Sequence, residues 1–180
     1  DFESNAFLGT IEQNTIQLPS SIDVEGTLQA TPVPYTHFGM TISPTATLRL
    51  MPGVILQAQN FAAITAEGEL IARGARTRPV IFTTVNPKSG LRWSGLTIRN
   101  KQQDTNVSVL ENCVVEFAGS FFGGANVTLD NASTPIRNCT ISDSSSVGIR
   151  LLNNAAPIIE NNAILQNASH GIQSASGSNP

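Results

Sequence analysis

The sequence predicts an all-β solenoid, a single domain in which short strands stack coil upon coil. Three observations carry this prediction. Helix formers are scarce while Thr, Ser, Asn, Gly, Val and Ile abound, apolar residues alternate over short runs, and the pattern recurs with a period of about 22 residues. A helical repeat of that length would need two amphipathic helices of about ten residues each, and no segment has that periodicity.

The C-terminal half repeats in two registers. The first consists of Glu111-Asn-Cys-Val-Val115, Arg137-Asn-Cys-Thr-Ile141 and Glu160-Asn-Asn-Ala-Ile164. The second consists of Asn126-Val-Thr-Leu129, Gly148-Ile-Arg-Leu151 and Gly171-Ile-Gln-Ser174. In both registers, equivalent positions lie about 22 to 26 residues apart, as in one repeat unit. Because two separate motifs recur with the same period, we interpret them as parts of one structural repeat.

The N-terminal half repeats at nearly the same period with a different motif. Its three copies are Glu25-Gly-Thr-Leu28, Thr45-Ala-Thr-Leu48 and Glu67-Gly-Glu-Leu70, with a step of about 20 to 22 residues. We therefore expect one domain over residues 1–180, a single-stranded right-handed parallel β-helix of about seven coils with 20–26 residues each. Coils stacked at the parallel-strand spacing of about 4.8 Å bury one continuous column of side chains.

Alternation along each strand predicts which side chains point into this column. The expected inward stacks are Leu28, Leu48 and Leu70; Val115, Ile141 and Ile164; and Val127, Ile149 and Ile172. A ladder at one turn is expected from Asn112, Asn138 and Asn161, whose amides can satisfy the polar groups of a sharp turn.

Several of these segments are similar to known repeats. Repeats of the bacterial right-handed β-helix family, which includes carbohydrate-binding proteins and sugar hydrolases, resemble two C-terminal segments, NNAILQNASHGI and RNCTISDSSSVGI. Coils of secreted and surface β-helix proteins resemble an earlier run, TLRLMPGVILQAQNFAAITAEGELIARGARTRPVIFTT followed by WSGLTI. The resemblance covers roughly residues 22–174. It implies the fold and an extracellular or cell-surface setting, and it is less specific for activity.

The sequence favours a protein without catalytic activity. Calcium-cluster lyase motifs and the acidic motifs of polygalacturonase-like members are not found, and the five aspartates are dispersed. Glu25 and Glu67 are expected about 10 Å apart, near the upper limit for an inverting glycosidase, but both precede a turn glycine. His170 fills a turn position, and His37 is expected on the surface. We predict no catalytic residue, no cofactor and no metal site.

The preferred binding site lies in two interruptions of the repeat. One spans residues 100–108 and contains Lys101 and Asp104, and the other spans 119–125 and contains Phe121 and Phe122. Insertions into a solenoid form loops, and loops carry function. These four residues are the predicted binding patch, with a glycan as candidate ligand. For Trp93, core packing is favoured over sugar stacking.

Equivalent charged and sulfur-containing residues recur one coil apart. Glu111, Arg137 and Glu160 should form ion pairs along one exposed column, and Arg99 and Asp130 another. Cys113 and Cys139 should face the core on neighbouring coils, where parallel Cβ vectors favour free thiols over a strained disulfide.

The ends of a solenoid expose its core and its strand edges. Residues 1–20 are expected to act as a cap or an exchange segment, and residues 171–180 as an incomplete last coil through which copies self-associate. The net charge of −3 and the scattered basic residues argue against nucleic-acid binding, and no apolar run is long enough for a membrane-spanning helix.

These features together predict a non-catalytic extracellular module that acts as a structural scaffold, an adhesion element or a self-assembly element of a surface or secreted protein. The alternative is a carbohydrate-binding or polysaccharide-degrading β-helix. A carboxylate cluster in a groove would favour the alternative.

Overall fold

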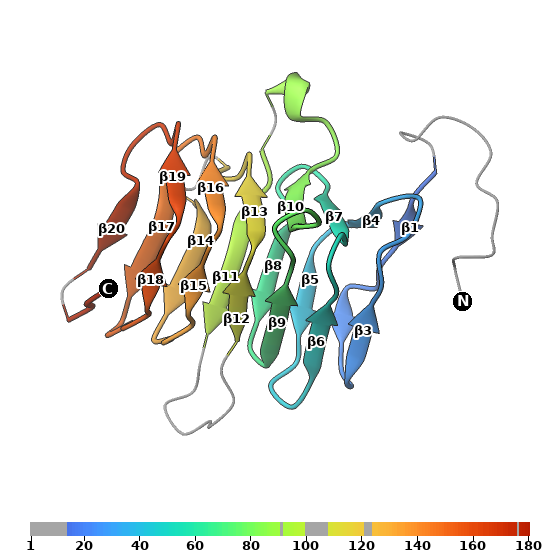
Figure 1. Ribbon diagram of the computed structural model, residues 1–180, viewed down its shortest axis with the longest axis horizontal. Coiled ribbons are helices and arrows are strands. Elements are labelled where there is room, and N and C mark those ends of the chain that lie inside the picture. Colours follow the sequence, from blue (N-terminus) through green and yellow to red (C-terminus); the bar gives the residue numbers. More distant parts are fainter. Residues whose placement is uncertain (1–13, 91, 100–107, 121–123, 176) are drawn as a thin grey trace.

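The structure, a computed structural model, describes residues 14–90, 92–99, 108–120, 124–175 and 177–180. These residues form a right-handed parallel β-helix, with β1 at one end of the rod and β20 at the other (Figure 1). Three parallel sheets, here called A, B and C, line its sides, and they contain seven, seven and six strands. The predicted fold class is confirmed, and the predicted coil number is close to the observed one.

Each coil passes through one strand of sheet A, then sheet B, then sheet C. Sheet A contains β1 (Ile16–Gln17), β4 (Tyr35–His37), β7 (Ile55–Ala58), β10 (Val80–Thr84), β13 (Cys113–Glu116), β16 (Thr140–Ser142) and β19 (Ala163–Leu165). Sheet B contains β2 (Ser21–Ile22), β5 (Met40–Ile42), β8 (Ala63–Ala66), β11 (Gly95–Arg99), β14 (Ala125–Asp130), β17 (Val147–Leu152) and β20 (Ile172–Ser174). Sheet C contains β3 (Gly26–Leu28), β6 (Thr47–Leu50), β9 (Glu69–Arg73), β12 (Val109–Glu111), β15 (Ile136–Arg137) and β18 (Ile159–Glu160).

The three corners of the coil differ in what they hold. We name them by the sheets they join: the A–B, B–C and C–A corners. The single 3₁₀ turn among the described elements, η1 (Pro87–Ser89), projects from the A–B corner between β10 and β11 (Figure 1). Within the described ranges, no helix is long and apolar enough to cross a membrane.

Two of the three predicted inward stacks have the predicted register. Val115 pairs with Ile141 and Ile141 with Ile164 in sheet A. Val127, Ile149 and Ile172 pair in the same way in sheet B. Exposure rises in the last described coil, where Ile172 is 38% exposed.

The leucine stack has a different register from the predicted one. Leu48 does pair with Leu70, but Leu28 pairs with Leu50, and Gly26 takes the position opposite Leu48. Because side chains alternate with period two, a two-residue slip keeps the same side chains inward. Alternation in the sequence therefore cannot separate the two registers.

The prediction for His37 was wrong. Its side chain is completely buried at the end of β4, in register with Ala58 and, one coil further, Thr84. Neither ring nitrogen has a hydrogen-bond partner among the described residues. Burial lowers the pKa of His37 to about 4, so the imidazole is neutral at physiological pH.

Asparagine recurs at the C–A corner. Asn112, Asn138 and Asn161 occupy equivalent positions there, and their φ angles of 49°, 53° and 57° place all three in the left-handed region. Asparagine tolerates this conformation better than most residues, because its short polar side chain can hydrogen-bond locally. The Nδ2 of Asn112 donates to the carbonyl oxygen of Gly74, 3.3 Å away.

A second group of asparagines bridges neighbouring coils. Asn126 is completely buried; its Oδ1 accepts from the Ala118 amide at 3.0 Å and its Nδ2 donates to the Ser142 carbonyl at 2.7 Å. Asn162 links the Cys139 amide to the Ile136 carbonyl in the same manner, with both distances 2.8 Å. These amides satisfy backbone groups at the corners, which the strand ladders leave unpaired.

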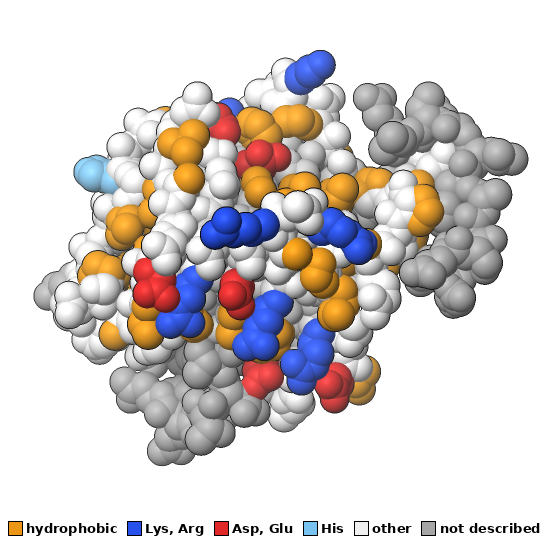
Figure 2. Space-filling view, viewed as in Figure 1, with side chains coloured by type: hydrophobic (Ala, Val, Ile, Leu, Met, Phe, Trp, Pro, Cys, Tyr) orange, Lys and Arg blue, Asp and Glu red, His pale blue; other side chains and the backbone are white. Residues whose placement is uncertain are grey.

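Charges on the outer faces pair along the solenoid axis, but Glu111 pairs with Arg73 and not, as predicted, with Arg137. Arg137 pairs with Glu160 and Arg99 with Asp130, and the first column extends to Arg73, which pairs with Glu111. Figure 2 shows acidic and basic side chains next to one another on one face of the molecule. Exposed pairs of this kind contribute less than about 1 kcal/mol each, so their main effect is on register.

The two cysteines are free and buried, as the sequence favours. The backbone amide of Cys113, in β13, donates at 3.4 Å to the Sγ of Cys139, which directly precedes β16 on the next coil. The hydrogen bond with Cys139, together with burial, raises the pKa of the Cys113 thiol. A neutral, buried thiol reacts slowly.

Candidate functional site

A hollow lies at the A–B corner of the coil, and we call it the corner hollow. Its volume is about 440 Å³, and it is lined by Phe61, Gly90, Arg92, Gly119, Ser120, Ser145 and Ser146. Four consecutive coils contribute, so it extends along the corner for about three strand spacings, roughly 14 Å. The projecting turn η1 borders it, because Gly90 directly follows that turn.

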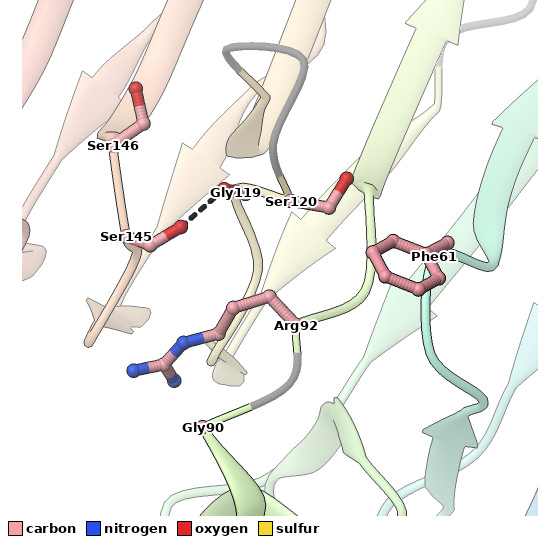
Figure 3. A pocket seen from close by; sticks show the side chains of 7 residues that line it. All are labelled: Phe61, Gly90, Arg92, Gly119, Ser120, Ser145 and Ser146. Carbon is pink, nitrogen blue, oxygen red and sulfur yellow. Dashed lines mark hydrogen bonds between the residues drawn. The ribbon is translucent and has the colours of Figure 1, made fainter.

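Arg92 supplies the positive charge of the corner hollow. Its guanidinium lies over the ring of Phe117, 5.3 Å from the ring centre, which holds the side chain by a cation–π contact. Figure 3 shows the side chain extending towards the Ser145 side of the hollow. Its Nη1 is buried and has no hydrogen-bond partner in the described part of the chain.

Phe61 lies on the opposite side of the corner hollow (Figure 3) and is 53% exposed. Its φ of 62° is unusual for a bulky residue. The next coil holds this backbone: the Phe61 amide donates to the Arg92 carbonyl at 3.0 Å, and the Phe61 carbonyl accepts from Ser94 Oγ at 2.8 Å. The fold thus stabilises a conformation that turns an aromatic ring to solvent.

Serine hydroxyls and a glycine complete the corner hollow. Ser145 Oγ donates to the Gly119 carbonyl (Figure 3), and Ser120 Oγ lies 3.0 Å from Ser94 Oγ. Gly119 has a φ of 91°, and a Cβ there would lie 2.7 Å from the Oγ of Ser144. A larger residue at position 119 would therefore strain the backbone and crowd the hollow.

A buried tryptophan packs in the core next to this corner. Trp93 is completely buried, and its Nε1 donates to the carbonyl oxygen of Glu116 at 2.8 Å, so its packing role is confirmed. The carboxylate of Glu116 accepts from Thr83 Oγ1 at 2.9 Å on the outer face of sheet A. Burial, and to a lesser extent the charge of Asp143, raise the pKa of Glu116.

The four predicted binding residues, Phe121, Phe122, Lys101 and Asp104, lie outside the described residues. Their described flanks belong to two different corners of the coil. Ser120, which precedes Phe121 and Phe122 in the sequence, lies in the corner hollow between sheets A and B, whereas Arg99, which precedes the stretch with Lys101 and Asp104, ends β11 of sheet B.

The carboxylates considered for catalysis are both engaged by arginines. Glu25 pairs with Arg49 at 3.2 Å, and Glu67 lies 3.9 Å from Arg99. Glu25 is in register with Glu69 through Thr47, not with Glu67. These contacts place the two carboxylates in separate ion pairs and not in one catalytic pair.

The His170 carbonyl accepts from the Gly148 amide at 2.9 Å, just before Ile149 pairs with Ile172, so His170 lies beside the turn that Val147 occupies one coil earlier, as the repeat predicts. Its Nδ1 contacts Ser169 Oγ at 2.8 Å on the surface of the last described coil. The residue therefore lies at a turn of the repeat, as expected from its position in the sequence.

Comparison with protein families agrees with this architecture. Residues 84–180, just over half of the chain, match the family model described as the right handed beta helix region. The chain belongs to the right-handed β-helix family. No curated protein and no solved structure matches it. Within this β-helix, no three His, Cys, Asp or Glu side chains of the described residues are grouped as metal ligands.

Of the residues that line the corner hollow, sequence reasoning singled out only Gly119 and Ser120, as part of the predicted 119–125 loop. Phe61, Arg92 and the serines are scattered over four coils and share no motif, so only the stacking brings them together. One available signal was the lengthened connection between Thr84 and Trp93, which contains Asn86-Pro-Lys-Ser-Gly90. Its Pro and Gly indicate a turn inserted at the same corner as the predicted 119–125 loop.

Proposed function

We propose that the protein is a non-catalytic β-helix module of a secreted or cell-surface protein, in which the stacked sheets are a rigid scaffold for a recognition site at the A–B corner. One observation carries the non-catalytic part. Glu25 and Glu67, the carboxylates best spaced by sequence for glycoside hydrolysis, are each paired with an arginine of a neighbouring coil. An inverting glycosidase needs two carboxylates that flank one glycosidic bond, whereas Glu25 and Glu67 each lie beside a different arginine.

The recognition part is supported by the corner hollow. It combines an exposed aromatic ring, an arginine and several hydroxyls on a backbone that the next coil holds rigidly. A rigid scaffold lowers the entropy cost of binding, which suits adhesion and ligand capture.

The test is an assay of polysaccharide breakdown run beside a binding screen. We expect no new reducing ends and no unsaturated products from a panel of neutral and acidic polysaccharides, together with retention on a subset of immobilised glycans. Chain shortening by the wild-type protein that Glu67→Gln abolishes would instead establish the alternative, a polysaccharide-degrading β-helix.

Self-association is a second candidate property, favoured by the last described coil. Its exposed apolar side chains are Ile158, Leu165 and Ile172, with exposed fractions of 53%, 43% and 38%. The three sheets end there at β18, β19 and β20, and at the other end at β3, β1 and β2. A second copy stacked head to tail would continue all three sheets in the parallel sense.

Light scattering over a wide concentration range tests this association. We expect the mass to rise with concentration and the rise to be lost in Leu165→Glu, which places a charge at the junction. Ser133→Glu, on the B–C corner away from the end, is the matched control. A strict monomer at all concentrations would contradict self-association.

A further inference from the structure

Arg92 differs from four arginines on the outer faces of the solenoid. Arg49, Arg73, Arg99 and Arg137 each pair with a carboxylate of a neighbouring coil. No carboxylate of the described residues lies within 4.0 Å of Arg92, and its Nη1 is buried without a partner there. Because no carboxylate of the described residues neutralises it, the guanidinium of Arg92 keeps its charge for an oxyanion that enters the hollow.

The hydroxyl groups of Ser120 and Ser145 in the corner hollow offer hydrogen-bond acceptors, whereas Arg92 offers donors. Ser94 donates its proton to the Phe61 carbonyl, so in the contact between Ser94 and Ser120 the donor is Ser120. Ser145 likewise donates to Gly119. Ser120 and Ser145 thus donate their protons within the protein, and their oxygens remain hydrogen-bond acceptors.

These two features define a complementary ligand. Arg92 offers N–H donors and a positive charge, which an oxyanion accepts, while Ser120 and Ser145 offer lone pairs, to which ligand hydroxyls can donate. The exposed ring of Phe61 provides an apolar face at the other side of the hollow. A ligand that carries an oxyanion and hydroxyls on a ring satisfies all three.

We propose that the corner hollow binds a hydroxylated organic oxyanion, with its carboxylate, sulfate or phosphate on Arg92 and its hydroxyls on Ser120 and Ser145. This inference rests on the proposed recognition function and names the ligand chemistry of that site. The three oxyanions share the acceptor geometry that a guanidinium fork binds through two parallel hydrogen bonds.

Titration calorimetry with simple probes tests the ligand class. The probes are glucuronate, glucose 6-sulfate and glucose 6-phosphate, with glucose as the neutral control and sodium sulfate and phosphate as ring-free controls. We expect at least one acidic sugar to bind roughly tenfold or more tightly than glucose, the effect of one charge-assisted hydrogen bond. The order of the three identifies the oxyanion, and stronger binding of the acidic sugars than of inorganic anions shows that the hydroxylated ring contributes.

Variants test the location. Arg92→Gln should weaken binding of the acidic sugar by roughly ten- to a hundredfold while leaving glucose unchanged. Arg92→Lys keeps the positive charge but loses the two parallel N–H donors of the guanidinium. Its affinity for the acidic sugar should lie between those of the wild-type protein and Arg92→Gln. Arg76→Gln removes the same charge at the C–A corner and is the matched control. Phe61→Ala should weaken acidic sugars but not inorganic sulfate.

Several results would overturn the proposal: equal affinity for glucuronate and glucose, no saturable binding of any acidic sugar, or equal losses in Arg92→Gln and Arg76→Gln. Circular dichroism shows whether Arg92→Gln folds. If it does not, the affinities of the wild-type protein for the different probes, together with those of Arg92→Lys, still test the proposal. A failure to bind anions would contradict the ligand proposal but not the non-catalytic scaffold function. Only the polysaccharide-breakdown assay can contradict that function.

Discussion

The buried side chain of Asn126 joins two coils, because its Nδ2 donates to the carbonyl oxygen of Ser142 at 2.7 Å while its Oδ1 accepts from Ala118 at 3.0 Å. Gly148 and Gly171 occupy the corresponding positions of the next two coils. The same amide is also 3.3 Å from Asn167 Oδ1, so the bridge extends over a third coil.

Replacing Asn126 should therefore be costly. Asn126→Ala leaves the Ala118 amide and the Ser142 carbonyl buried without partners, and we expect a loss of about 3 kcal/mol in the free energy of unfolding. Thr128→Ala, which alters an outward side chain of the same strand, should cost about 0.5 kcal/mol or less. Urea unfolding measures both. Equal losses in the two variants would show that the bridge contributes nothing.

His37 should make the stability of the protein depend on pH. Its pKa in the folded chain is about 4, against 6.5 in the unfolded chain, so the unfolded state binds a proton first as the pH falls. The stability due to the neutral imidazole is complete above pH 6.5 and is lost progressively down to pH 4. At about 1.4 kcal/mol per pKa unit, the total loss is about 3 kcal/mol.

Denaturant unfolding at pH 7.5 and pH 4.5 tests this dependence, with His37→Leu as the comparison. The variant cannot take up the proton, so the wild-type protein should lose more stability than His37→Leu over this interval. Because the carboxylates titrate in both proteins, the difference isolates His37. An identical pH response in the two proteins would be inconsistent with a buried neutral imidazole.

Glu111 lies between two arginines of the outer face of sheet C. It pairs with Arg73 at 4.0 Å and is in register with Arg137 on the other side. Glu111→Arg places three like charges in one column and should cost about 1 kcal/mol at low salt. The cost should shrink in 1 M salt, where the Debye length is about 3 Å. Glu111→Gln, which removes the pair without adding repulsion, should cost less; a larger cost in high salt would contradict the explanation.

The cysteines should be inaccessible thiols. Cys113 and Cys139 are 1% and 2% exposed, so we expect no reaction with a thiol reagent in the native protein and two thiols per chain after denaturation. Intact mass should not change on treatment with a reductant. A mass increase of about 2 Da on reduction would reveal a disulfide between neighbouring coils, despite the strain expected of nearly parallel Cβ vectors.

Much of the fold follows from local pattern. The repeat period and the alternation of Val115 with its neighbours predicted the coil, the inward face and the register with Ile141. The ion pairs of Arg99 and Arg137 were predictable for the same reason, since residues one period apart must become neighbours. Period and alternation are local properties, and a solenoid repeats them faithfully.

Other features needed the stacked chain. A slip of two residues preserves the inward face, so the sequence could not distinguish Leu28 opposite Leu50 from Leu28 opposite Leu48. The burial of His37 likewise depends on the coil stacked against it, because it pairs with Ala58 across the sheet.

Local pattern in the chain is thus sufficient to establish that it coils, how long each coil is and which side chains face inward in most strands. Only the stacking of the coils brings Arg92, Phe61, Ser120 and Ser145 together at one corner. The same stacking buries the Nη1 donor of Arg92 there. The physical reason is that inward positions repeat with the coil and are visible as a pattern, whereas corner residues vary from coil to coil. Their neighbours are set by the lengths of the insertions and by the left-handed turns that the stacking holds in place.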